Sequence, residues 1–366
     1  MGTMIHLAVG RLEVDWGKNN FFTDHGALFQ PTDLKPVPSY YAAEEWPEGE
    51  PVVEMSEGFG KPLGHVLSRL ELLGYTLRSV EHHYNQLHQF HDLDEEALPF
   101  DELRQALARV DVNRVSGNYS EDYEPGEFVR KEMLERLALN SERHDYYNPG
   151  LRPDHWEVDL LLENFGANGA LRLLAENPAN LGLDVSWDFT PLVESGWAKR
   201  DEFHAGPSPE QCFLVVTEGS SDAKIIQKAL QLFRPHIADF FRFVDMEEGY
   251  PFSGTGNLHK FTQGLISIGI QNNTVVVYDN DAEGIAKMLA TKKLSLPPNM
   301  CVMQLPNLDA FTNFKTIGPT GIGHADINGR AAAIECYLDL EKDGLPEPII
   351  RWSAFSRELD AYHGEL

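Results

Sequence analysis

Two short acidic motifs follow two apolar segments in the second half of the chain, and their side chains could bind a divalent cation. One apolar segment ends just before Glu218 and Asp222, and the other ends just before Asp279 and Asp281. Residues two apart on an extended chain point the same way, so Asp279 and Asp281 can converge on one ion. Hard cations prefer several oxygen ligands, and a dication offsets the repulsion between close carboxylates. The motifs therefore predict a Mg²⁺ or Mn²⁺ site.

The segments around these motifs predict alternating strands and helices. Strands are expected at 212–217, 240–244, 274–278 and 300–304, and helices at 221–232, 258–270, 283–292 and 329–340. That order indicates a mostly parallel sheet with helices on both faces. Each acidic motif then lies at the carboxyl end of a strand, where open α/β sheets bind ligands. The ordinary alternative makes Asp222 a helix cap and Glu218 a surface charge, but the second motif favours a shared site.

The pair of motifs resembles the Toprim fold shared by topoisomerases, primases, and the OLD-type and maturation nucleases. The segment from Gly254 to Leu258 resembles the glycine-bearing turn of that family. The resemblance implies that Glu218 is a metal ligand or general acid/base and that Asp279 and Asp281 bind metal. It also implies that Asp222 is an added ligand of the nuclease-like branch.

A third segment has two interpretations. It runs from Gly318-Pro-Thr-Gly321 through Asp326 and Arg330 to Glu335, which is expected on a helix. Glu335 is either a surface acid on a packing helix or a ligand of a second metal site, and Arg330 could bind phosphate. The segment resembles the C-terminal part of Toprim proteins of bacterial conflict systems.

The first part of the chain has a different pattern. Residues 1–58 are rich in prolines and partly alternate apolar and polar residues, which indicates strands and loops. Residues 59–205 are mainly helical, with helices expected from residue 63 and at 100–108, 126–139, 156–165 and 170–175. A glycine- and proline-rich linker follows. The expected fold class is thus α/β, with a short β-rich segment (1–58), a helical HEPN-like domain (59–205) and a Toprim-like domain with a C-terminal extension (206–366).

The helical region contains a second candidate catalytic pair. Arg78 and His83, with four residues between them, match the signature of HEPN ribonucleases, in which the His is thought to act as acid/base and the Arg to stabilise phosphate charge. On one helix the two side chains diverge by roughly 140°, so a bend or a dimer partner is required to bring them together. The alternatives are a polar helix face or a transition-metal site formed by His82, His83, His88 and His91, which lack the cysteines of a structural zinc site.

The whole chain resembles the HEPN/Toprim-associated bacterial proteins, in which a helical domain precedes Toprim. The segments Gly10–Asn19 and Leu70–Leu77 carry that resemblance. Such proteins are thought to act in anti-phage defence. The resemblance implies a nucleic acid substrate, and either a homo-oligomer or a partner defence protein.

Composition limits the alternatives. The net charge of −27 argues against binding phosphate through a generally basic surface, so a nucleic acid groove must be a local exception. No apolar run approaches the ~18–20 residues that span a bilayer, no signal peptide opens the chain, and three scattered cysteines fit the reducing cytoplasm. The P-loop and zinc-finger spacings are missing. Residues 362–366 form no obvious terminus, so a truncated C-terminus is possible.

These features favour a Mg²⁺- or Mn²⁺-dependent nuclease that hydrolyses RNA or DNA. One alternative is a non-catalytic Toprim scaffold whose acidic surface docks a partner effector. The other is a metal-independent ribonuclease that uses Arg78 and His83.

Overall fold

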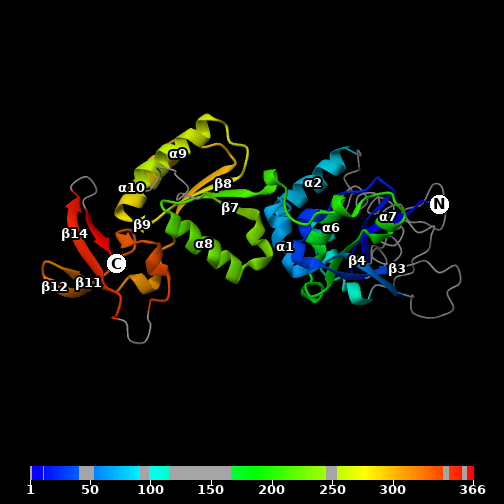
Figure 1. The fold of residues 1–366 in the computed structure, drawn as a ribbon, viewed down its shortest axis with the longest axis horizontal. Coiled ribbons are helices and arrows are strands. Elements are labelled where there is room, and N and C mark those ends of the chain that lie inside the picture. Colours follow the sequence, from blue (N-terminus) through cyan, green and yellow to red (C-terminus); the bar gives the residue numbers. More distant parts are fainter. Residues whose placement is uncertain are drawn as a thin grey trace. The chain divides into compact units, whose positions relative to one another are not determined.

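The computed structural model divides the chain into two compact units, 1–207 and 208–366 (Figure 1). It describes residues 2–10, 12–40, 53–90, 99–114, 166–244, 254–340, 346–356 and 361–366. The helices expected at 126–139 and 156–165, and His91, lie outside these residues. None of the helices within the described ranges is long and apolar enough to cross a membrane.

The first unit is built on a five-stranded antiparallel sheet. Its order is β2 (Leu12–Lys18), β1 (Met4–Val9), β5 (Asp184–Asp188), β4 (Val53–Pro62) and β3 (Leu34–Tyr40). The chain returns from the helices to place β5 in the middle of the sheet. Residue 58, the expected end of the β-rich segment, lies within β4, and the expected segments 1–58 and 59–205 both belong to the unit 1–207.

Helices pack on this sheet through a common core. They are α1 (Leu63–Leu72), α2 (Leu77–Phe90), α3 (Phe100–Leu107), α6 (Ala167–Leu174) and α7 (Thr190–Glu194), with short 3-10 turns η1 (Gly26–Leu28), η2 (Pro31–Asp33), η3 (Val112–Arg114), η5 (Pro178–Asn180) and η6 (Arg200–Glu202). The apolar stripe of α1 is buried at Leu63, Val66 and Leu70, as its spacing of three and four predicts. Trp187 of β5 is 1% exposed in the same core, so sheet and helices stabilise one another.

The second unit contains a four-stranded parallel sheet. Its order is β10 (Met300–Gln304), β8 (Thr274–Tyr278), β6 (Phe213–Val216) and β7 (Phe241–Phe243). Helix α8 (Ser220–Phe233) lies on one face, and α9 (Thr255–Ser267) and α10 (Ala282–Lys292) lie on the other (Figure 1). The central strands are apolar and buried, as at Val216 and Val276. The predicted α/β class, with helices flanking a parallel sheet, is confirmed.

A smaller layer follows the parallel sheet. It comprises β9 (Asn280–Asp281) paired with β13 (Ala331–Ala332), and a sheet ordered β12 (Gly321–Ala325), β11 (Phe314–Gly318), β14 (Ile350–Ser356) and β15 (Ala361–Glu365), with 3-10 turns η7 (Pro209–Gln211), η8 (Pro235–Phe240), η9 (Asp309–Phe311) and η10 (Ile334–Tyr337) in the unit. The helix expected at 329–340 is therefore wrong. Ala331 and Ala332 pair with β9 and are buried in a small core, and this tertiary pairing overrides the helix propensity of alanine.

Asn180 provides a test of the first unit. Its side chain is fully buried; its amide nitrogen donates to the carbonyls of Val110 (2.8 Å) and Leu174 (2.9 Å), and its oxygen accepts from the Val112 N–H (3.0 Å). Asn180→Ala should lower the free energy of unfolding by about 2–4 kcal/mol, because three buried hydrogen bonds are lost and the Val112 N–H loses its acceptor. Urea denaturation of the full chain measures this, and the exposed Asn113→Ala is the control. Equal stability of the two variants would contradict the assignment.

Candidate active site

Glu218 and Asp222 are positioned by the turn from β6 into α8. Glu218 follows the end of β6 directly after Thr217, and one of its oxygens (Oε1) accepts a hydrogen bond from the Asp279 N–H at 2.9 Å. Asp222 lies in the first turn of α8, where its Oδ2 accepts from the Gly219 N–H at 2.9 Å. The Glu218 bond joins the carboxyl ends of β6 and β8, so the two acidic motifs meet at one edge of the sheet.

Alternation along the second motif separates its two aspartates from the residue between them. Asn280 is fully buried, and its side chain accepts from Gln304 Nε2 and the Gly329 N–H, both at 3.0 Å. Asp279 and Asp281 flank it, both half-buried. Oδ1 of Asp281 also caps α10, since it accepts from the Gly284 N–H at 2.6 Å. Because successive side chains of an extended segment point to opposite sides, Asn280 faces the interior while both aspartates face the site.

The pKa of each of the four carboxyl groups is raised above its ordinary value. Burial is the largest cause for each of them. It raises the pKa of Glu218 to about 8, together with the charges of Asp279, Asp281 and Asp222, while the bond from the Asp279 N–H opposes the shift. The pKa of Asp279 rises to about 7 through burial and the charges of Asp222, Asp281 and Glu335. The pKa values of Asp222 and Asp281 are also raised. Thus the four side chains form one electrostatic cluster.

Glu335 belongs to the surroundings of this cluster, although its expected helix does not exist. It lies on η10, where its charge raises the pKa of both Asp222 and Asp279, and the neighbouring Ile334 N–H donates to the Asp279 carboxylate. A residue that was not predicted from the sequence is His363 on β15, whose charge lowers the pKa of Asp281. No local motif marks His363, because it reaches the site only through the pairing of the C-terminal strands.

The donor chemistry of the cluster fits a hard cation. Among the described residues, no three His, Cys, Asp or Glu side chains form a ready-made set of metal ligands. One oxygen of Glu218, of Asp222 and of Asp281 accepts a hydrogen bond from a backbone N–H. Each carboxylate has a second oxygen, and Mg²⁺ usually keeps several waters, so a hydrated ion suits this set. A dication would also offset the repulsion that raises the pKa values.

Arg78 and His83 are not brought together within one chain. Both are exposed on α2, which runs without interruption from Leu77 to Phe90. At about 100° per residue, side chains five positions apart diverge by roughly 140°. They also belong to the first unit, whereas the acidic cluster belongs to the second.

Comparison with known proteins gives one match. A family model described as HEPN/Toprim N-terminal domain 1 matches residues 1–211. No curated protein and no solved structure matches the chain. The matched residues contain the first unit and end before Glu218, so the acidic cluster lies beyond them.

The raised pKa of Glu218 predicts how stability changes with pH. Between its ordinary pKa of 4.5 and about 8, the folded protein holds this proton more tightly than the unfolded chain does. Stability from Glu218 is therefore present below pH 4.5 and is lost as the pH rises through about 8. Glu218→Gln should match the wild-type melting temperature near pH 4 and exceed it above pH 8, measured by calorimetry. The control is Glu347→Gln. Lys315 lowers the pKa of Glu347, so removing the Glu347 charge should not raise the melting temperature above pH 8.

Gly284 tests how tightly α10 packs on the cluster. An added Cβ would lie 2.5 Å from the Asp279 carbonyl oxygen and 3.0 Å from both Asp281 Oδ1 and Glu218 Oε1. Gly284→Ala should therefore lower the melting temperature and reduce any stabilisation by Mg²⁺. Gly264→Ala in α9 meets nothing within 4 Å and should stabilise the helix by roughly 0.5–1 kcal/mol. If both variants gained stability, the close approach of α10 would be disproved.

Proposed function

Because the chain belongs to the HEPN/Toprim N-terminal domain 1 family, we propose that it is a metal-dependent nuclease whose active site is the cluster of Glu218, Asp222, Asp279 and Asp281. The family association suggests a nuclease-like or defence-related role and nucleic acid as the ligand. The observation that carries the proposal is the burial of four carboxylates at the ends of two adjacent parallel strands. Burial raises the pKa of all four carboxyl groups, and neighbouring carboxylates add to the rise at Glu218 and Asp279, as expected of a site built for cations.

We extend the Toprim resemblance to residues 208–366 on the same basis. A parallel sheet carries Glu218 at the end of β6 and the two aspartates at the end of the adjacent β8. The turn at Gly254 supports this edge, since its N–H donates to the Glu218 carbonyl at 3.0 Å. This is the arrangement that the Toprim motifs require.

The residues of the cluster have distinct roles in this proposal. Bound Mg²⁺ or Mn²⁺ would activate water and stabilise the charge of a scissile phosphate. Asp279 and Asp281 hold the cations, with Asp222 as an added ligand. Glu218, whose pKa of about 8 lies near neutrality, is suited either to share in cation binding or to transfer a proton. Glu335 on η10 adds negative charge beside Asp222 and Asp279, where a second cation would be held.

The setting is proposed from the family association. A nuclease joined to a HEPN/Toprim-type N-terminal unit fits bacterial anti-phage defence, with the first unit as the place for substrate recognition, self-association or contact with a partner defence protein. Exposed Arg78 and His83 would act in ribonuclease chemistry only if a second copy completed the pair.

The test is cleavage of labelled single- and double-stranded RNA and DNA in Mg²⁺, Mn²⁺ or EDTA. Wild-type protein should cleave only with metal, and Asp279→Asn/Asp281→Asn should lower the rate by at least about a hundredfold because the cations lose their ligands. Glu347→Gln, an exposed carboxylate of the same unit, is the matched control and should retain activity.

Two results would point elsewhere. Cleavage of RNA that persists in EDTA and is lost in Arg78→Ala or His83→Ala would move the activity to the first unit. No cleavage in any condition, with a melting temperature that is indifferent to Mg²⁺, would favour a non-catalytic scaffold.

A further inference from the structure

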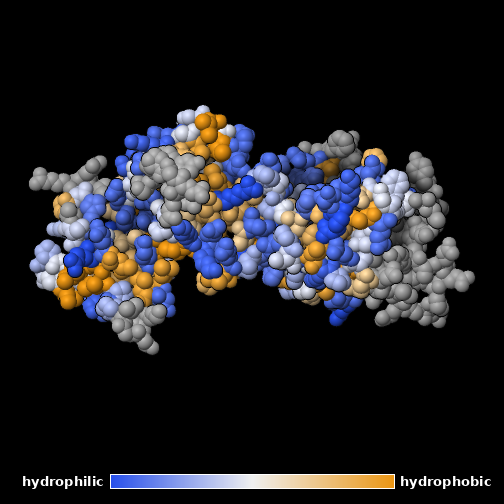
Figure 2. Space-filling view, in the orientation of Figure 1, coloured by the Kyte–Doolittle hydropathy of each residue, from blue (hydrophilic) through white to orange (hydrophobic). Residues whose placement is uncertain are grey.

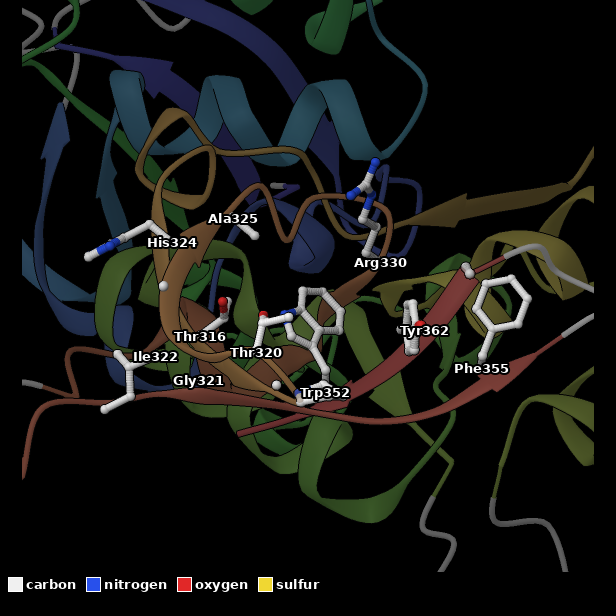
Figure 3. A pocket seen from close by; sticks show the side chains of 14 residues that line it. Thr316, Thr320, Gly321, Ile322, His324, Ala325, Arg330, Trp352, Phe355 and Tyr362 are labelled. Carbon is white, nitrogen blue, oxygen red and sulfur yellow. The ribbon is translucent and has the colours of Figure 1, made fainter.

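A pocket on the small sheet of the second unit combines three aromatic rings with an arginine. Its volume is about 640 Å³, within the ~300–1,000 Å³ typical of ligand sites. Trp352 and Phe355 of β14, Tyr362 of β15 and Arg330 line it, together with the β11–β12 hairpin (Figure 3). None of these residues belongs to the acidic cluster.

The hairpin contributes two open glycine positions to the pocket. Gly321 and Gly323 of β12 line the pocket, and an added Cβ at either would meet nothing within 4 Å. At Gly318 of β11, an added Cβ would instead lie 3.4 Å from Cδ1 of Trp352. The space beside the backbone is therefore open at Gly321 and Gly323, while Gly318 lies against the indole ring of Trp352.

Two of the three aromatic rings are exposed, whereas Trp352 is half-buried against the small core of the unit. Phe355 and Tyr362 are directly opposite on β14 and β15, with ring centroids 4.9 Å apart, and are 45% and 49% exposed. Figure 2 shows hydrophobic residues gathered over the region of β11 and β12. An exposed apolar patch with aromatic rings is typical of a binding surface, and planar groups stack well on such rings.

The charge of the pocket differs from that of the whole protein. The chain has 57 acidic residues and a net charge of −27, yet Asp and Glu do not occur among the residues that line the pocket. Arg330 is exposed, and its guanidinium forms no ion pair with any residue in the described part of the chain. The pocket thus lacks the negative charge of the rest of the protein, as a ligand that carries both rings and phosphate requires.

Arg330 also connects the pocket to the acidic cluster. Its carbonyl accepts a hydrogen bond from the Ala282 N–H at 3.3 Å, and the next residue, Ala331, pairs with Asp281. A strand held at Arg330 therefore lies beside the segment that carries Asp281.

We propose that this pocket binds an unpaired segment of a nucleic acid strand, with bases stacked on Trp352 and Tyr362 and a backbone phosphate on Arg330. Stacking accepts any base, so the pocket recognises single strands without reading their sequence. Delivery of the bound strand from the pocket to the acidic cluster rests on the proposed nuclease function. Binding in the pocket does not.

Binding is measured on the full chain in EDTA at low salt, so that cleavage does not interfere. The probes are fluorescein-labelled single strands of about twelve nucleotides, RNA and DNA, followed by fluorescence anisotropy. Tyr362→Ala, Arg330→Ala and Gly323→Leu should each weaken binding about five- to a hundredfold, since each removes a stacking ring, removes the cation or fills the pocket. Arg351→Ala, an exposed arginine on the opposite face of β14, is the matched control and should bind like wild type.

The outcomes separate this proposal from the nuclease function. Binding that is weakened by the pocket variants but not by Asp279→Asn/Asp281→Asn supports the pocket, even if no cleavage is ever seen. Binding unchanged in all three pocket variants would overturn it, even if the protein cleaves. If Arg351→Ala weakened binding equally, the effect would come from the overall charge of the protein and would overturn the pocket. If a mononucleotide bound as tightly as the strand, the ligand would be a mononucleotide and not a strand.

Discussion

The buried side chain of Asn280 connects the parts of the second unit that surround the acidic cluster. Its oxygen receives hydrogen bonds from Gln304 and from the Gly329 backbone, and its nitrogen donates to Asn307 at 2.9 Å. These partners come from the end of β10, the loop after it and the segment before β13. One amide thus fixes the parallel sheet to the smaller layer. Because a buried amide left without partners is costly, the chain on both sides of Asn280 has little freedom, and the adjacent aspartates inherit fixed positions.

The fold around the cluster supplies hydrogen bonds that favour the charged carboxylates. The raised pKa values of Glu218 and Asp279 reflect the cost of burying these carboxylates and, second, of placing them beside other acids. Backbone N–H groups of Gly219, Asp279 and Gly284 offset part of that cost by donating to the carboxylates. The same unit also has a pocket whose lining contains no acid, and one lining residue, Arg330, is bonded through its backbone to the segment that carries Asp281.

Local patterns in the sequence are enough to predict the parallel sheet and the residues at its edge. The run 274–278 has three consecutive valines, because one face of β8 is buried and the other is half-buried, and such a strand can be recognised without its neighbours. β13 could not be predicted, since two alanines become a strand only by pairing with Asp281 and Asn280. The positions of His363 and of the aromatic pocket are set by the register of β14 and β15, which the sequence does not reveal. The glycines from 318 to 323 predict a turn and give no sign of a binding surface. What escaped prediction is what arises from contacts distant in sequence.

The central position of β5 has a consequence for how the first unit is made. β1 ends at Val9 and β4 ends at Pro62, but the strand that joins them begins only at Asp184. As the chain leaves the ribosome, β1 and β4 therefore each have an unpaired edge until β5 emerges. Unpaired strand edges can associate with other chains. Any fragment that ends before residue 188 lacks part of the central strand, so the sheet of the first unit can be completed only after β5 has been synthesised.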